Sequence, residues 1–306
     1  MRRGRIKAFA TVTAAAVALT GATALAVVAT GNPVRSVPLN DSGVWVTNDV
    51  DGIFGRQDNV AMGLDALVIP QGGGGAGHAL DIVQDGETVV GYDMRQSQLI
   101  AIDPLTLEQT DGEIEHGSRI SMAGGTLAVF SPSTGKIWAT RYTPGQVLDN
   151  LGALAPQNDP VASIDKATAA GGGAMTVTET GSVIAVDSAG HRVRVDPTDS
   201  GFAKPQQTDV GRRGAVALSA VGDHVVVVDP ATGTVQVDDG PRVDAGAKGI
   251  VVQQPGPDRP AVLLASERAL ISVPLTGGTR EVLYSAADGA PASPIVLGDC
   301  SYAAWS

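Results

Sequence analysis

Apolar and polar positions alternate in short runs along most of this chain. From about residue 80 onward, apolar residues either alternate with polar ones or run four to six together, and Gly or Pro interrupts them every 8 to 15 residues. Such runs are typical of β-strands joined by tight turns, and no long segment there shows the 3.6-residue period of an amphipathic helix. Leu148 to Ala155 is the one segment that allows a short helical turn. The pattern therefore predicts an all-β fold.

A unit of three strands recurs along this region. Successive units begin near residues 79, 119, 174, 215, 250 and 294, a mean step of about 43 residues. Repeats of about 40–50 residues, each several strands long, are typical of β-propeller blades. We therefore expect a β-propeller of about six to seven blades. The alternative is a β-sandwich built from several unrelated hairpins.

Hairpin turns of one chemistry separate the strands. In the segment 225–239, an apolar strand ends at Asp229-Pro230, and a second strand begins after Thr232-Gly233. The Asp side chain accepts backbone N–H groups, Pro fixes φ near −65°, and Gly adopts the positive φ that the turn requires. Related residues recur at Ser131–Gly135, Asp103-Pro104 and Asp196-Pro197.

The last unit of the repeat is incomplete. Its strands are expected near Pro294–Gly298 and Tyr302–Trp305. Because a half blade leaves strand edges unpaired, we expect the natural gene product to continue beyond Ser306, or the open reading frame to be truncated. Val34–Leu39 would help to close the ring without replacing a hairpin. Cys300, the single cysteine, is either an unpaired thiol, a thiol with a partner elsewhere or a small buried hydrophobe.

The N-terminus predicts the cellular compartment. Residues 1–7 contain four basic side chains, and residues 8–30 are uncharged and mostly Ala, Val, Leu and Thr. That length crosses a bilayer as a helix, and the basic residues before it predict a cytoplasmic N-terminus. We favour an uncleaved signal anchor over a signal peptide cleaved after Ala26, which would secrete the remainder. Residues 31–41 are interpreted as a spacer, and residues 42–306 as the extracytoplasmic domain.

The charge balance narrows the choice of partners. The chain has 32 acidic residues against 21 Lys and Arg, a formal net charge of −11. This balance argues against nucleic acid, which selects basic patches, and against peripheral binding to anionic lipid. Contact with the membrane is then expected only through the N-terminal helix, and an envelope protein or a glycan is the suspected partner.

Two segments resemble a known group of proteins. Residues 42–68 contain Trp45-Val46-Thr47-Asn48 and Gly52-Ile53-Phe54-Gly55-Arg56, and residues 298–306 contain Cys300 and Ala303-Ala304-Trp305. They resemble large membrane-anchored actinobacterial proteins, in which one N-terminal helix precedes a β-propeller-like region and then fibronectin type III or immunoglobulin-like repeats. The resemblance implies a membrane location and this architecture, and it carries no catalytic residues. The chain departs from the pattern by ending before any such repeat.

One short segment resembles part of a calcium loop. Asp49, Asp51 and Asp58 are the candidate ligands, and Gly52 occupies the position of the invariant glycine. However, Thr47 is a poor first ligand, an Asp is short for the bidentate last position, and no flanking helices are evident. A hairpin turn at Asp51-Gly52 is therefore the favoured interpretation.

The sequence holds no convincing catalytic motif. It lacks a G-x-S-x-G elbow, and Gly72–Gly77 lacks the Gly-Lys-Ser/Thr of a phosphate loop. The histidines form no metal-binding motif and are interpreted as surface residues: His78, His116, His191 and His224. Ala128–Arg141 resembles the blade motif of quinoprotein dehydrogenases, but Trp138 comes one position early and the other units lack this Trp. A quinoprotein-like oxidoreductase is the less favoured alternative, and no cofactor is expected.

These patterns together predict a binding or scaffolding module rather than an enzyme. Propeller loops converge around a central channel, so any site is expected on loops between strands. The candidate loops are Asp85-Gly86, Gly124-Gly125, Thr180-Gly181 and Gly222-Asp223. Each of them also has the sequence of an ordinary tight turn.

Overall fold

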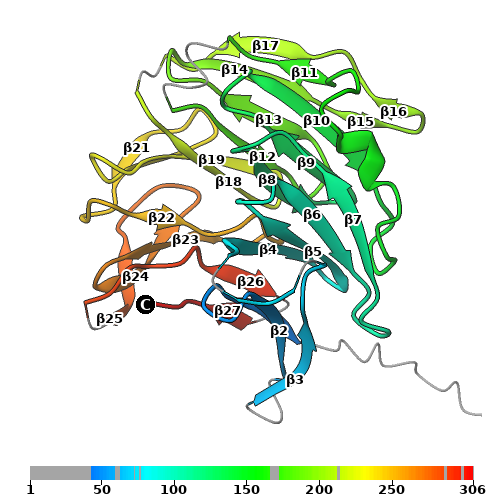
Figure 1. The fold of residues 1–306 in the computed structure, drawn as a ribbon. Helices are drawn as coiled ribbons and strands as arrows, with labels where there is room; N and C mark the ends of the chain where they lie inside the picture. Colours follow the sequence, from blue (N-terminus) through cyan, green and yellow to red (C-terminus); the bar gives the residue numbers. More distant parts are fainter. Residues whose placement is uncertain are drawn as a thin grey trace, which may run out of the picture. The chain divides into compact units, whose positions relative to one another are not determined.

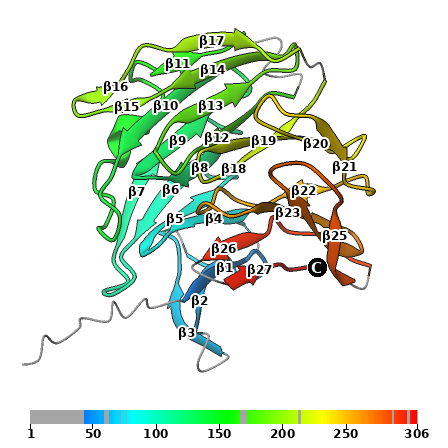
Figure 2. The same cartoon turned by 180° about the vertical axis from the view of Figure 1, so that it is seen from behind.

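Five four-stranded antiparallel sheets make up most of the structure (Figures 1 and 2). The computed structural model describes residues 43–58, 63–71, 73–75, 77–165, 172–211, 214–285, 288–297 and 300–305. In each sheet, strands that follow one another along the chain pair with one another, which is the arrangement that the repeat predicts.

The bounds of these strands follow the chain. The first sheet contains β4 (Leu80–Asp85), β5 (Thr88–Asp93), β6 (Gln98–Ile102) and β7 (Gln109–Glu113). The second contains β8 (Arg119–Ala123), β9 (Thr126–Phe130), β10 (Lys136–Arg141) and β11 (Ala162–Ser163). The third contains β12 (Ala174–Val177), β13 (Val183–Val186), β14 (His191–Val195) and β17 (Gln206–Asp209). The fourth contains β18 (Ala217–Val221), β19 (His224–Asp229), β20 (Thr234–Val237) and β21 (Arg242–Asp244). The fifth contains β22 (Val251–Val252), β23 (Ala261–Ser266), β24 (Ala269–Pro274) and β25 (Glu281–Ser285).

Two small elements interrupt this series. A hairpin of β15 (Pro197–Thr198) and β16 (Gly201–Phe202) lies between β14 and β17 along the chain. The 3-10 helix η1 (Leu151–Leu154) is the single helix among the described residues, and it falls inside the segment expected to form a helical turn.

The Asp-based turns form as their chemistry predicts. Asp229 Oδ1 accepts hydrogen bonds from the backbone N–H groups of Ala231 and Thr232, at 3.0 and 3.2 Å, and Gly233 has φ +74°. Asp93 and Asp103 accept backbone N–H groups in the same way. Asp196 differs, because its carboxylate accepts Ser182 Oγ and Arg194 Nε and the small hairpin β15–β16 follows it.

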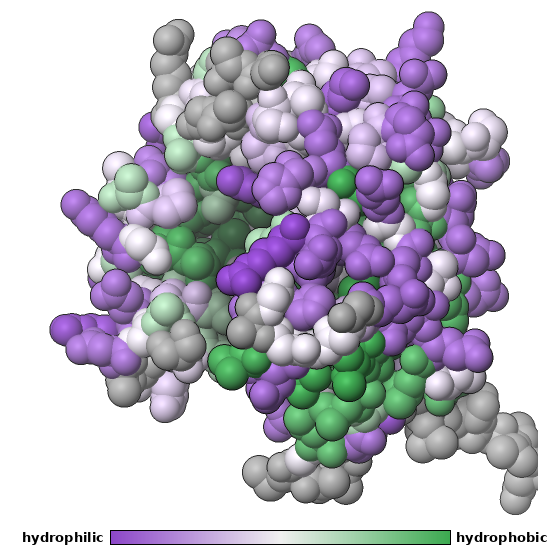
Figure 3. Space-filling model, in the orientation of Figure 1, coloured by the Kyte–Doolittle hydropathy of each residue, from purple (hydrophilic) through white to green (hydrophobic). Residues whose placement is uncertain are grey.

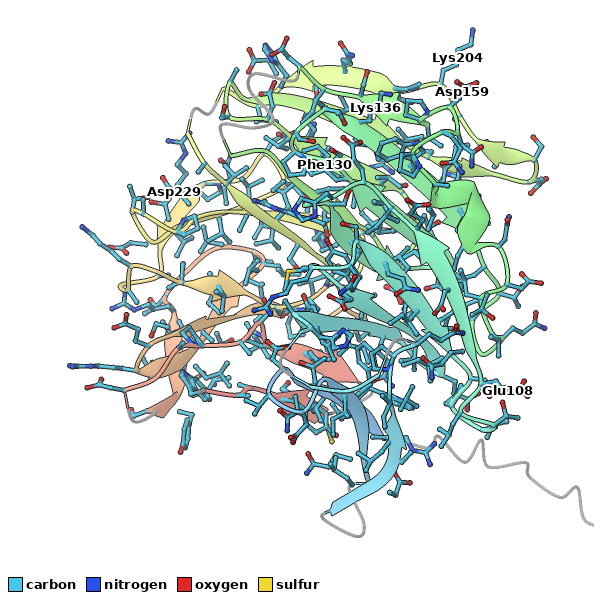
Figure 4. All side chains as sticks on the ribbon, viewed as in Figure 1. Glu108, Phe130, Lys136, Asp159, Lys204 and Asp229 are labelled. Atoms are coloured by element: carbon cyan, nitrogen blue, oxygen red, sulfur yellow. The ribbon has the colours of Figure 1, made fainter. Side chains whose placement is uncertain are left out.

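The core lies between neighbouring sheets. Strands β5, β9 and β13 are buried along their whole length, because each has a sheet against both of its faces. Phe130 of β9 is fully buried among apolar residues of the second and third sheets, whereas Lys136, across the turn, is exposed (Figure 4). Leu151 and Leu154 of η1 join the core between the first and second sheets.

A smaller region completes the described structure. Strands β1 (Val44–Asn48), β2 (Ile53–Asp58) and β3 (Gly63–Val68) form a three-stranded sheet. Strands β26 (Ile295–Leu297) and β27 (Cys300–Tyr302) form a hairpin at the place of the last predicted unit. Within the described residues, the ring thus consists of six sheets and the hairpin β26–β27.

Contacts join each part of this region to a different sheet. Trp45 and Phe54 pack against apolar residues of the first sheet. The hairpin adjoins the fifth sheet, because Gln254 N donates to Pro294 O at 2.8 Å and Trp305 Nε1 donates to Ser266 O at 2.8 Å.

Strand β1 runs opposite to its neighbour β4. Near the start of β1, Trp45 N donates to Gln84 Oε1 close to the end of β4. Just beyond the end of β1, Asp49 Oδ1 accepts Leu80 N at the start of β4. Neighbouring inner strands elsewhere run in the same direction, since their following turns meet: Glu179 N, just after β12, donates to Gly222 O, just after β18.

The predicted membrane helix, residues 8–30, lies outside the described residues, as does Val34–Leu39. Across the part of the chain that the structure describes, no helix has the length and apolar character needed to cross a membrane.

Candidate binding face

All four predicted loops lie at one end of the sheets. Each connects the first strand of a sheet to its second: β4 to β5, β8 to β9, β12 to β13 and β18 to β19. We call the residues of these turns the turn rim, comprising Asp85–Glu87, Gly124-Gly125, Glu179–Gly181 and Gly222-Asp223.

The first contact along the turn rim joins the first and second sheets. Tyr142 Oη, just after β10, donates to Asp85 Oδ2 at 2.5 Å. Burial, followed by the neighbouring Asp85 carboxylate, raises the pKa of Tyr142 far above its usual value. Tyr142 therefore remains a neutral hydrogen-bond donor, and the contact has a structural role.

At the second contact, the backbones of two turns approach closely, one from the second sheet and one from the third. A Cβ on Gly124, which has φ +55°, would lie 2.1 Å from Glu179 O of the third sheet. A Cβ on Gly181, which has φ +81°, would lie 2.5 Å from Arg141 Nη1. Arg141 Nη1 in turn donates to Gly124 O at 3.2 Å and to Thr126 Oγ1 at 2.6 Å. Only glycine fits at these two positions, because both the space and the backbone conformation exclude a side chain.

The third contact is a side-chain clamp between the third and fourth sheets. Thr180 N and Thr180 Oγ1 both donate to Asp223 Oδ1, at 3.0 and 2.7 Å. Burial opposes ionisation of Asp223, but the hydrogen bonds from Thr180 outweigh it and lower the pKa of Asp223. Glu179 N also donates to Gly222 O, and Gly222 N donates to Gly256 O in the β22–β23 loop of the fifth sheet. The turn rim is therefore continuous from the first sheet to the fifth.

The exposed part of the turn rim is mostly acidic. Glu87, Glu179 and Asp223 are exposed, and Arg141, which ends β10, is an exposed cation beside them. The arrangement presents fixed carboxylates and backbone groups on a surface held by contacts between sheets, which suits recognition of a partner.

Of the calcium candidates, Asp49 and Asp51 lie in the β1–β2 turn and Asp58 does not. Asn48 Oδ1 accepts the N–H groups of Val50 and Asp51, and Gly52 has φ +62°. The Asp49 carboxylate accepts Leu80 N, and Asp51 Oδ2 accepts Asn48 Nδ2. Asp58 ends β2, at the other end of that strand from the turn. In the described ranges, no group of three or more His, Cys, Asp or Glu is placed to hold a metal ion.

Three histidines contact aspartates, which the sequence did not indicate. His78 Nδ1 lies 2.5 Å from Asp93 Oδ2, and its Nε2 lies 2.7 Å from Gly73 O. The other two pairs are His191 with Asp187 and His224 with Asp238. His116 instead contacts Ser97 Oγ. The histidine–aspartate pairs connect turns or strand ends.

Two other predicted residues have clear environments. Cys300 is exposed, so its interpretation as a small buried hydrophobe is wrong. Trp138 is buried in the core between the first and second sheets, and its Nε1 donates to Asn158 O at 2.9 Å. Trp138 therefore fills a core position and is not exposed on the surface.

Known proteins resemble this chain in structure and not in sequence. No family model and no curated protein sequence matches it. The β-propeller domain of Cps50 (Swd1) from Myceliophteria thermophila aligns with TM-score 0.54 and 10% identity, over 84% of this chain and 86% of that one. The chain is a β-propeller. A chain of the mitotic checkpoint complex aligns with TM-score 0.55 and 9% identity, over 84% and 78%. Hsv2 of Kluyvelomyces marxianus aligns with TM-score 0.50 and 9% identity, over 80% and 81%. At these identities the likeness extends to the propeller fold alone.

Proposed function

We propose that this β-propeller is a binding or scaffolding module, held at the outer side of the cell membrane by residues 8–30. The fold is typical of such modules, and one structural neighbour belongs to a multiprotein complex. The basic residues before the uncharged segment support the orientation. The resemblance to membrane-anchored actinobacterial proteins supports the same location.

The turn rim is the observation that carries the proposal. It joins five sheets through turns fixed by backbone and side-chain hydrogen bonds, so its exposed groups are held in place before any partner arrives. A preorganised surface loses little entropy on binding. No catalytic pair is found among the described residues of the turn rim, where Asp85 and Asp223 are already bonded to Tyr142 and Thr180. An envelope protein or a glycan is the proposed partner.

The first experiment locates the protein and its partner. The full-length chain with a C-terminal tag is expressed in its native cells, the membranes are separated, and the intact cells are treated with a membrane-impermeant crosslinker. We expect the chain in the membrane fraction, crosslinked to an envelope component. A soluble chain that the reagent does not modify would contradict the tether.

A matched set of variants tests whether the partner binds at the turn rim. Glu87→Lys with Glu179→Lys reverses two exposed charges on the turn rim, whereas Glu267→Lys reverses one in the β23–β24 turn, at the opposite end of the sheets. We expect the first change to reduce crosslinking at least tenfold, because like charges then replace complementary ones. Equal crosslinking of both variants would remove the turn rim from the proposal.

A further inference from the structure

A cavity lies where the two smaller parts of the fold meet. Its volume is about 540 Å³, and its lining combines β1 and β4 residues with residues in and around the C-terminal hairpin: Ala292, Ser293, Ile295, Tyr302, Ala303 and Ala304. We call it the seam cavity. None of its lining residues belongs to the turn rim, so an inference about it is independent of the proposed function. Its size is within the range of ligand sites.

The cavity follows the edge of β1. Val44, Trp45, Val46 and Thr47 all line it. Because successive side chains of a strand point to opposite faces, four consecutive lining residues mean that the strand borders the cavity along its edge. Within the described part of the chain, β1 pairs only with β2. At the start of this edge, the Gln84 side chain accepts Trp45 N and donates to Gly43 O. Beyond Trp45 the edge has no backbone partner among the described residues, so a further strand can pair there.

The direction of β1 identifies what the edge lacks. In the regular sheets, the second strand runs antiparallel to the first. The turns that follow the first strands β8, β12 and β18 contact one another, so these innermost strands run the same way. Since β1 runs antiparallel to the neighbouring innermost strand β4, it has the direction of a second strand. The position of a first strand, antiparallel to β1, is the position of the seam cavity.

One carboxylate gives the cavity its charge. Asp81 of β4 lines it and is exposed there, although β4 is an inner strand. Its Oδ1 accepts the adjacent Ile82 N at 2.8 Å, and no Lys or Arg among the described residues forms an ion pair with it. The protein atoms packed around the Asp81 carboxylate, reinforced by nearby Asp49, disfavour its charged form and raise the pKa of Asp81. A cation in the cavity would relieve both effects.

The remaining lining suits apolar side chains. Val46, Ile82 and Ile295 border the space together with Trp45 and Tyr302. Apolar surface continues on the outer face nearby, where Leu64 and Leu67 of β3 are 54% and 55% exposed. Figure 3 shows this apolar area over β2 and β3 at the lower part of the molecule.

We infer that the seam cavity binds an extended segment of a partner polypeptide, which adds to the edge of β1 and places a Lys or Arg side chain at Asp81. Backbone pairing supplies the extended geometry, as in other cases of strand addition. Apolar side chains of the segment contact Val46 and Ile295, and the basic side chain neutralises Asp81. The negative cavity selects a basic segment over an acidic one.

The test uses two synthetic peptides that differ in one charge. Acetyl-Thr-Val-Lys-Val-Thr-amide is compared with the same peptide carrying norleucine in place of Lys. Each is titrated into the isotopically labelled full-length protein, and NMR follows the amides of Val44–Thr47 and the indole of Trp45. We expect the Lys peptide to shift these signals and to bind at least tenfold more tightly, the effect of one charge-assisted hydrogen bond.

Variants separate this site from general electrostatic attraction. Asp81→Asn should abolish the difference between the two peptides. Asp111→Asn, which removes a partly buried carboxylate from β7 of the same sheet, should preserve it. Ser293→Trp, which fills the cavity, should weaken both peptides. Equal affinity of the two peptides for the wild-type protein, or an unchanged difference in Asp81→Asn, would overturn the inference. Binding of butylammonium as tight as that of the Lys peptide would also overturn it, since it would indicate a small-cation site without strand pairing.

Discussion

The five four-stranded sheets differ from the region formed by β1–β3 and β26–β27 in how completely their apolar side chains are buried. In the regular sheets, the central strands are buried on both faces. In the smaller region, Trp45 and Phe54 are buried against the first sheet, but Leu64 and Leu67 on β3 remain exposed. The difference shows that apolar residues of a propeller sheet are buried only where a neighbouring sheet covers them, and burial of apolar surface stabilises a fold. Predictions can therefore be graded by how completely a residue is covered.

The largest expected effect is in a regular sheet. Phe130→Ala removes a fully buried ring between the second and third sheets. Loss of such a side chain typically costs about 3–5 kcal/mol, because transfer and cavity terms add. Leu67→Ala on the uncovered face should cost less than about 0.5 kcal/mol. Chemical denaturation monitored by circular dichroism measures both free energies of unfolding. Similar losses for the two variants would break the comparison.

The next effect concerns how neighbouring sheets are joined. Gly181→Ala places a Cβ against Arg141 Nη1 and Gly124 O in a left-handed conformation. Strain of this kind costs about 1–3 kcal/mol. Gly152→Ala is the matched control, because nothing lies within 4 Å of its added Cβ and its φ is ordinary. A melting temperature that falls for Gly181→Ala and holds for Gly152→Ala would support the close approach of the turns.

A third effect tests the connection between the two regions. His78 lies in the segment from β3 to β4, and its side chain is 10% exposed. The hydrogen bond to Asp93, opposed by burial, raises the pKa of His78. A raised folded-state pKa gives stabilisation that is complete below the unfolded value of about 6.5 and is lost as pH rises through the folded value.

Replacing His78 makes the pH dependence of this stabilisation measurable. His78→Gln should lower stability by about 1 kcal/mol at pH 6 and by less at pH 9, in line with a charge-assisted hydrogen bond. The exposed pair of His224 and Asp238 serves as the control, because solvent screens such pairs. Denaturation of His78→Gln and His224→Gln across this pH range provides the measurement. An equal pH dependence for both would show that burial of the pair is irrelevant.

The sequence predicted the covered elements much better than the uncovered ones. Apolar runs and Asp-based turns predicted the first three strands of the regular sheets. The fourth strands β7 and β17, with sequences QTDGE and QQTD, went unpredicted, because strands with exposed polar residues carry no apolar alternation.

The sequence predicted only part of the turn rim. Turn chemistry identified its four loops, but the clamp between Thr180 and Asp223 spans 43 residues and depends on how two sheets meet. The charge of the seam cavity was equally hidden, because Asp81 gains its surroundings from β1 and the C-terminal hairpin.

The smallest expected effect is at the hairpin itself. Trp305 holds the hairpin to the fifth sheet through the hydrogen bond of Nε1 to Ser266 O and through ring contact with Tyr284, whose centroid lies 5.9 Å away. Trp305→Phe keeps a ring and removes the N–H donor, at a cost of about 0.5–1.5 kcal/mol. Because β26 and β27 pair only with each other among the described strands, this cost should appear as local opening. Hydrogen exchange should therefore accelerate at Ile295–Leu297 and remain unchanged in β9. Acceleration in both places would mean that the hairpin unfolds together with the five regular sheets, and the distinction between the two regions would then fail.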